Sequence, residues 1–147
     1  MREIKIRAWD KVAKQWLWVT GIETAETSKS DGYTLEGIFH DGDFVGHEDI
    51  IVTQCTGLKD KNGQDIYVGD IVKVSKTITQ GGEYRDISYN AEVSLNYGMY
   101  CVGYRDDLLP GQITTLIETL HNMDYWDPAE VIGNIFENPE LLEDADN

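Results

Sequence analysis

The sequence has few cysteines, no long hydrophobic run and little positive charge. Cys55 and Cys101 are the only cysteines among 147 residues, and without an export signal we expect reduced core thiols rather than a disulfide. Charges interrupt residues 1–7, so we do not expect a signal peptide, and no apolar stretch approaches the length of a membrane span. These absences predict a cytoplasmic protein.

Positive charge is missing from the last third of the chain. The sequence has 12 Lys and Arg against 27 Asp and Glu, a formal net charge of −15. No Lys or Arg follows Arg105, whereas these acidic residues do: Asp106, Asp107, Glu118, Asp124, Asp127, Glu130, Glu137, Glu140, Glu143, Asp144 and Asp146. Because such a surface repels phosphate backbones, we do not expect direct binding of nucleic acid. The charge either only keeps the protein soluble or forms an acidic face directed at a basic partner.

Alternating apolar and polar residues predict more strand than helix. The alternation at 3–9 and 15–21 predicts an opening hairpin, and the alternation at 87–95, followed by 99–104, predicts a second one. Further strands are expected at residues 33–39, 50–55, 71–74 and 131–136, with polar connections at 28–32 and 40–49.

Asn62 and Gly63 predict the tip of another hairpin. Both residues tolerate a positive φ, which a type I′ turn requires. We therefore expect Gly63 at positive φ between two paired strands. The substitution Gly63→Val should destabilise the protein by roughly 1–2 kcal/mol, because a β-branched residue is strained there.

Helix is expected mainly at Ile113–Leu120 and Pro139–Leu142. The first segment has apolar residues at positions i, i+3, i+4 and i+7, although its β-branched residues disfavour a helix. The second follows Asn138, a potential N-cap, and has proline at its first position. The predicted fold is α+β and predominantly β, with small antiparallel sheets or a barrel-like core. We expect one domain over residues 1–142 and an acidic tail at 143–147.

No pattern of catalytic or metal-binding residues is complete. His40 and His47, with carboxylates nearby, could bind a transition metal, but their spacing matches no recurrent ligand set, so we expect solvent-facing loop residues without metal. The segment 60–71 lacks glycine at the sixth position of a calcium loop. No serine lies in a nucleophile elbow, and both cysteines lie in apolar strand contexts that would raise the pKa of a thiol. We predict no catalytic residue, no metal site and no cofactor.

Aromatic residues are plentiful. The sequence has eight tyrosines and four tryptophans, namely Trp9, Trp16, Trp18 and Trp126. Such residues build stacking platforms for bases or sugars, but in a small sheet protein they more often fill the core and cross-strand pairs. We expect the second role here.

Three segments of the chain resemble the YopX family of small phage and prophage proteins. They are residues 1–10 (MREIKIRAWD), 54–72 (QCTGLKDKNGQDIYVGDIV) and 131–141 (VIGNIFENPEL), at the start, middle and end of the chain. Phe136 stands where the family pattern leads us to expect tyrosine. The resemblance implies a β-rich α+β domain and a phage or prophage setting, and it implies no activity and no catalytic residue.

These observations predict a non-catalytic accessory protein of a mobile element that binds an unidentified host or phage protein. One alternative is a DNA mimic that uses the acidic C-terminal half, including Glu118, Asp124, Asp127 and Glu130, against a host protein that binds nucleic acid. A second is an enzyme or small-ligand binder that uses the loop with His40 and His47 or exposed aromatic residues. A third is a self-assembling structural protein joined as a homo-oligomer through its sheet edges.

Overall fold

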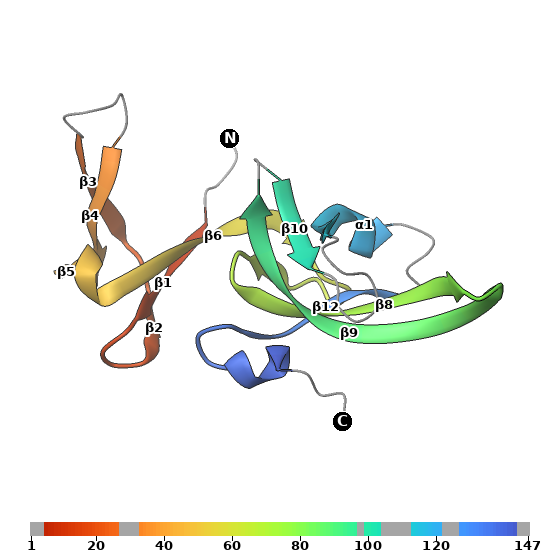
Figure 1. Cartoon of the computed structure of the whole chain (residues 1–147). Helices are drawn as coiled ribbons and strands as arrows, with labels where there is room; N and C mark the ends of the chain where they lie inside the picture. Colours follow the sequence, from red (N-terminus) through yellow and green to blue (C-terminus); the bar gives the residue numbers. More distant parts are fainter. Residues whose placement is uncertain (1–4, 27–32, 97–98, 104–112, 122–126, 144–147) are drawn as a thin grey trace. The chain divides into compact units, whose positions relative to one another are not determined.

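The computed structural model describes residues 5–26, 33–96, 99–103, 113–121 and 127–143. Internal contacts divide the chain into two compact units, residues 1–54 and residues 55–147 (Figure 1). Strand far exceeds helix, and every described strand pairing is antiparallel, which confirms the predicted fold class. The expectation of one domain over residues 1–142 stays a prediction.

The first unit contains two small sheets. Its described strands are β1 (Ile6–Asp10), β2 (Gln15–Leu17), β3 (Gly21–Glu26), β4 (Tyr33–His40), β5 (Asp43–Gly46) and the first half of β6 (Ile50–Lys59). In one sheet β1 pairs with both β2 and β6, and in the other the order is β3-β4-β5. The predicted opening hairpin is confirmed, although its second strand ends at Leu17 and not at Gly21. Asp10 stabilises the turn, since its Oδ1 accepts hydrogen bonds from the backbone of Val12 and Ala13.

The predicted polar connection at 40–49 is wrong over residues 43–46, which form β5. Asp41 and Gly42 have φ values of 50° and 85° and make a two-residue turn, so β4 continues directly into β5. A short 3-10 helix, η1 (His47–Asp49), follows. The Asp-Gly pair was the available signal, because that dipeptide favours a tight hairpin.

The core of the first unit lies between its sheets' apolar faces. Ala8, Leu17, Ile38 and Ile50 are buried there, and the half-buried residues Val19, Val45 and Val52 pack against them.

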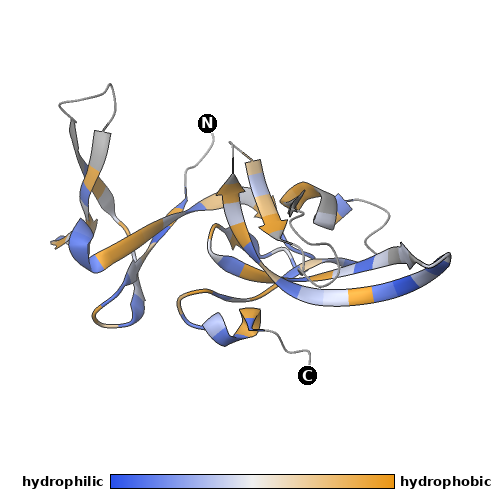
Figure 2. Ribbon diagram, viewed as in Figure 1, coloured by the Kyte–Doolittle hydropathy of each residue, from blue (hydrophilic) through white to orange (hydrophobic). Residues whose placement is uncertain are grey.

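The second unit is built on a five-stranded sheet in the order β11-β10-β9-β8-β12. Its described strands are β7 (Asp65–Tyr67), β8 (Asp70–Gln80), β9 (Glu83–Asn96), β10 (Met99–Gly103), β11 (Ile113–Thr115) and β12 (Asp127–Asn134). β8 and β9 form one long curved ribbon whose tip is hydrophilic (Figures 1 and 2). Gly81 and Gly82, both at positive φ, make its turn.

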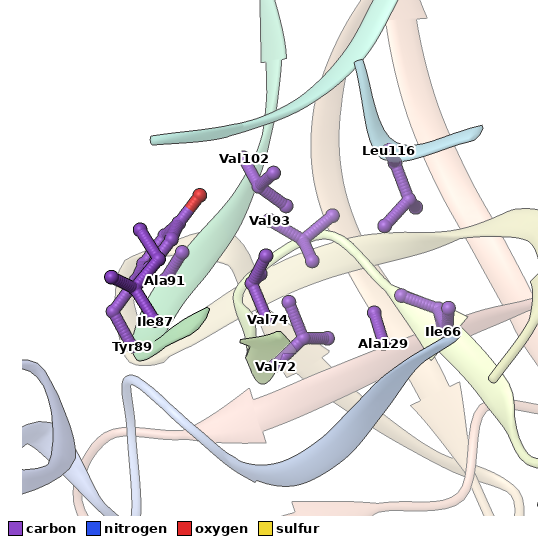
Figure 3. Close-up of a cluster of buried hydrophobic side chains, with 10 residues drawn as sticks. All are labelled: Ile66, Val72, Val74, Ile87, Tyr89, Ala91, Val93, Val102, Leu116 and Ala129. Carbon is purple, nitrogen blue, oxygen red and sulfur yellow. The ribbon is translucent and has the colours of Figure 1, made fainter. Parts of the chain in front are cut away.

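The core of the second unit confirms the alternation predicted for residues 87–95 as far as Val93, whereas Leu95 is 47% exposed. Four alternate residues of β9 are buried, and residues of β7, β8, β10, α1 (Leu116–His121) and β12 complete the cluster. Figure 3 shows the ten side chains: Ile66, Val72, Val74, Ile87, Tyr89, Ala91, Val93, Val102, Leu116 and Ala129.

The helix predicted for Ile113–Leu120 is wrong in its first part. Residues 113–115 form β11, and the helix α1 begins only at Leu116. The predicted apolar stripe also fails at Ile117, which is 52% exposed, whereas Thr119 is buried. Ile-Thr-Thr is β-branched throughout and pairs with β10, so strand pairing outweighs the helical period. No helix in the described ranges is long and apolar enough to cross a membrane.

The predicted helical turn at Pro139–Leu142 is present as a 3-10 helix, η2. Asn138 precedes it, but its side chain does not cap it. Instead, Asn138 Oδ1 accepts a hydrogen bond from the backbone of Asn134, at 3.3 Å.

The hairpin tip predicted at Asn62 and Gly63 is confirmed in place but not in turn type. β6 pairs with β7 on either side of it, and Gly63 has a φ of 81°. Asn62 is not among the described residues at positive φ, so the turn is not type I′. Gly63 N donates to Asp60 O and Asp60 N donates to Gln64 O, which matches a type I turn followed by a glycine bulge.

Both cysteines are free thiols, as predicted. Cys101 is buried on β10, whereas Cys55 on β6 is only half-buried.

The charged carboxylate of Glu92 destabilises the folded state, and this effect depends on pH. Burial on β9 raises the pKa of its carboxyl above the usual 4.5. At a pH above that raised pKa the charged form destabilises the folded state. This destabilisation disappears as the pH falls below 4.5. Because the carboxyl is still partly solvated, Glu92→Gln should raise Tm at pH 7 by only about 1–2 °C. The gain should vanish near pH 4. Glu83→Gln, which removes the same charge from an exposed site on β9, is the control and should give a smaller gain.

Candidate interaction surface

The loop within the second YopX-like segment is organised around a buried carboxylate. Asp60 is 6% exposed. Its Oδ1 accepts hydrogen bonds from Asn62 N and Gln64 N, and its Oδ2 accepts one from Val131 N, each at 2.9 Å. Three backbone donors therefore compensate the buried charge. This carboxylate serves the fold, because both of its oxygens are occupied by the backbone.

The same loop covers β12, an edge strand of its sheet. Lys61 N donates to Ala129 O at 3.1 Å. The Lys61 ammonium donates to Asp127 Oδ2 at 2.8 Å, and this hydrogen bond raises the pKa of Lys61. Asn62 Nδ2 donates to Glu130 Oε2 at 2.9 Å. Two of the acidic residues considered for DNA mimicry, Asp127 and Glu130, are thus engaged within the protein.

His40 and His47 each use one ring nitrogen on the backbone. His40, the last residue of β4, donates from Nδ1 to Trp18 O at 2.8 Å, and His47 in η1 donates from Nδ1 to Glu36 O at 3.2 Å. His47 is exposed as predicted, whereas His40 ends a strand and its side chain is 31% exposed. The part of the chain that the structure describes contains no cluster of three or more potential metal ligands. The absence of a metal stays a prediction.

The tryptophans divide between two roles. Trp9 and Trp16 are cross-strand partners of β1 and β2 with ring centroids 5.0 Å apart, and the Arg7 guanidinium lies 4.2 Å from the Trp16 ring. This confirms the cross-strand role for that pair. Trp18 is 75% exposed, contrary to expectation, and Trp126 lies outside the described residues.

Two phenylalanines form an outward aromatic face on the sheet β3-β4-β5. Phe39 and Phe44 are direct cross-strand partners with ring centroids 5.5 Å apart. Their neighbours in register, Ile38 and Val45, lie on the opposite side of the sheet, in the core. Phe44 nevertheless remains 52% exposed. We call the surface formed by Phe39 and Phe44 the phenylalanine face.

Glycines beneath the rings position the phenylalanine face. A Cβ on Gly37 would lie only 2.7 Å from Phe44 Cζ, and a Cβ on Gly21 would lie 3.4 Å from Phe39 Cδ2. Each ring therefore lies over the backbone of a neighbouring strand, as aromatic residues do when they cover strand glycines. The sequence predicts a polar connection at 40–49, so this face was not expected.

The stretch of sequence that contains Phe39 and Phe44 is acidic and has no lysine or arginine. The sequence has no Lys or Arg between Lys29 and Lys59. Over the described residues of that interval, five exposed acidic residues occur: Glu36, Asp41, Asp43, Glu48 and Asp49. The exposed charges of the chain segment that carries the phenylalanine face are therefore all negative.

Comparisons with known proteins agree with the resemblance found in the sequence. The model of the family described as YopX protein matches residues 5–143. Among solved structures, protein EF1440 from Enterococcus faecalis is 24% identical, with 97% of this chain and 100% of that chain covered and a TM-score of 0.57. Protein yopX from Bacillus subtilis is 23% identical, with 94% and 97% covered and a TM-score of 0.51.

The two structural matches support a shared fold, and no curated protein matches the chain. The family match spans nearly all of the sequence, and it includes the loop around Asp60 and the strand β12 that this loop covers. The chain therefore belongs to the YopX family.

Proposed function

We propose that this chain is a non-catalytic accessory protein of a phage or prophage that binds another protein through the phenylalanine face. The observation that carries this proposal is the outward position of Phe39 and Phe44, on the side of the sheet opposite the core. Exposed aromatic rings surrounded by polar residues are typical of the centres of protein interfaces.

The phenylalanine face is also prepared for binding before a partner arrives. Phe44 is confined by the Gly37 backbone below it and by the edge-to-face contact with Phe39 beside it. A side chain that is already held in one position loses little conformational entropy when it is buried by a partner. Burial of the exposed ring would then contribute favourably to the binding free energy.

The acidic DNA-mimic alternative has less support from the described residues. Asp127 bonds to Lys61, Glu130 to Asn62, and Glu137 Oε1 accepts a hydrogen bond from Asn134 Nδ2. Carboxylates held in this way support the loop at 60–64 and the turn at 134–138. Amide substitutions at Asp127 or Glu130 would therefore weaken contacts with the loop at 60–64 as well as remove charge.

The proposal is tested by placing a photo-crosslinking phenylalanine analogue at Phe44 and exposing the protein to a lysate of its native host. We expect one dominant protein adduct, which should be absent when the analogue replaces Val12, a 76% exposed residue in the turn between β1 and β2. Phe44→Ser should also lose the captured protein in affinity purification, whereas Val12→Ser should retain it. Equal capture by the two serine variants would contradict the proposal.

A further inference from the structure

We infer that the partner contributes an extended, basic segment that pairs with the free edge of β5 as a fourth strand of the sheet β3-β4-β5. This inference rests on the proposed function and names the chemistry of the partner. β5 is the last strand in the order β3-β4-β5, so one of its sides has no described strand beside it. An extended peptide can supply the missing hydrogen bonds by strand addition.

The pairing of β4 with β5 fixes which backbone groups are available. A two-residue turn makes its flanking residues, His40 and Asp43, a hydrogen-bonded pair. Hydrogen-bonded and non-hydrogen-bonded pairs alternate along an antiparallel ladder, so Val45 also bonds toward β4. The N–H and C=O groups of Phe44 and Gly46 consequently point away from β4, where an added strand could bond to them.

The opposite edge of this sheet is less suited to strand addition. The pairing of β3 with β4 has an irregularity between Glu23 and Thr24. Such irregularities disturb the ladder and protect edges from further pairing. By contrast, β5 keeps a continuous register with β4 from Asp43 to Gly46.

Strand addition would also bring a partner side chain onto the phenylalanine face. Directly opposed residues in an antiparallel pair have Cβ atoms about 4.5–5.5 Å apart on the same face. The partner residue opposite Phe44 would therefore lie beside its exposed ring. An aliphatic side chain there would bury the ring, and an arginine would stack on it.

Charge selects a basic segment over a second copy of this chain. Asp41 and Asp43 lie at one end of β5, Glu48 and Asp49 follow its other end, and all four are exposed. In an antiparallel pair of two β5 edges, Asp41 and Asp43 of each copy would approach Glu48 and Asp49 of the other. The carboxylates would repel one another, so this pairing is unfavourable. Lysine or arginine residues of a partner would instead meet carboxylates at both ends.

Gly46 offers a variant that blocks the edge with little effect on the fold. Its φ of −69° and ψ of 152° suit proline, and a Cβ there would meet no atom within 4 Å. Gly46→Pro removes one outward N–H group and places a ring at the edge. Gly46→Ala adds a Cβ but keeps the N–H, so it is the matched control.

The test measures binding of a fluorescent peptide of alternating lysine and valine by anisotropy. Wild type and Gly46→Ala should bind the peptide equally, and Gly46→Pro should bind at least about tenfold more weakly, as expected for losing a hydrogen bond and the access to the edge. A peptide with glutamate in place of lysine should not bind. Circular dichroism and Tm of the Gly46 variants report whether the fold is retained.

Three outcomes would overturn the inference. The first is equal binding of the lysine–valine peptide by Gly46→Pro and Gly46→Ala. If Phe44→Ser still loses the captured protein in that case, the proposed function stands without strand addition. The second is no binding of the lysine–valine peptide to the wild-type protein. The third is self-association of the wild type in analytical ultracentrifugation that Gly46→Pro abolishes, which would identify a second copy as the occupant of the edge.

Discussion

Asp60→Ala should lower the free energy of unfolding by about 3 kcal/mol, a large part of the total stability of a small domain. The substitution leaves the backbone N–H groups of Asn62, Gln64 and Val131 without the carboxylate that accepts them. Because Asp60 is buried, water does not readily replace these bonds. The loop should also lose the hydrogen bond that joins it to Val131 of β12. Urea denaturation measures the change.

Two further variants make this prediction specific. Asp60→Asn can keep the oxygen that accepts from Asn62 and Gln64 but would direct an amide N–H toward Val131 N, so it should destabilise by about half as much. Lys59→Ala removes a solvent-exposed ion pair with Asp65 and should cost no more than about 1 kcal/mol. An equal loss in Lys59→Ala and Asp60→Ala would contradict the assigned role of the buried carboxylate.

The strands were predictable wherever side-chain alternation dominates. Ile87, Tyr89, Ala91 and Val93 face the core and identify β9 from the sequence alone, and the β-branched run at 50–55 identifies β6. The type of turn at 60–64 was not predictable from Asn62 and Gly63. It depends on Asp60, whose third hydrogen bond comes from Val131, a residue far along the chain.

The phenylalanine face was not predictable for a related reason. Phe44 and Val45 stand in a stretch that is otherwise polar or glycine. The Asp-Gly pair signals the turn, but the place of the Phe44 ring over Gly37 depends on the register of β5 against β4. Likewise, the apolar spacing at 113–120 favours a helix, but β10 provides a partner for residues 113–115 that a local pattern does not show. In each case a contact between separate strands decides the outcome.

The YopX-like segments describe the fold better than they describe the function. Residues 54–72 and 131–141 contain Asp60, Gly69 and the turn at Asn134, all of which form hydrogen bonds that hold the second unit. Phe39 and Phe44 lie between the first and second segments. The proposed binding surface therefore lies outside the three segments, although inside the residues 5–143 that the family model matches.

Gly69→Val should destabilise the protein by about 3 kcal/mol or more, because it combines backbone strain with a steric clash. Gly69 has a φ of 95°, a conformation that a β-branched residue adopts only with strain. A Cβ there would lie 3.1 Å from Cε2 of Phe136. The backbone cannot easily shift to relieve this contact, since Gly69 N donates to Val93 O and Gly69 O accepts from Ile135 N, both at 2.9 Å.

Gly63 provides the matched control for this substitution. Its φ of 81° is similar, but a Cβ there would meet no atom within 4 Å, so Gly63→Val should cost only the strain, roughly 1–2 kcal/mol. The difference between the two variants in urea denaturation measures the clash with Phe136. Phe136→Leu, which shortens the side chain, should reduce that difference when combined with Gly69→Val. Equal losses at Gly63 and Gly69 would show that Phe136 moves aside without cost and that the turn into β8 tolerates a side chain.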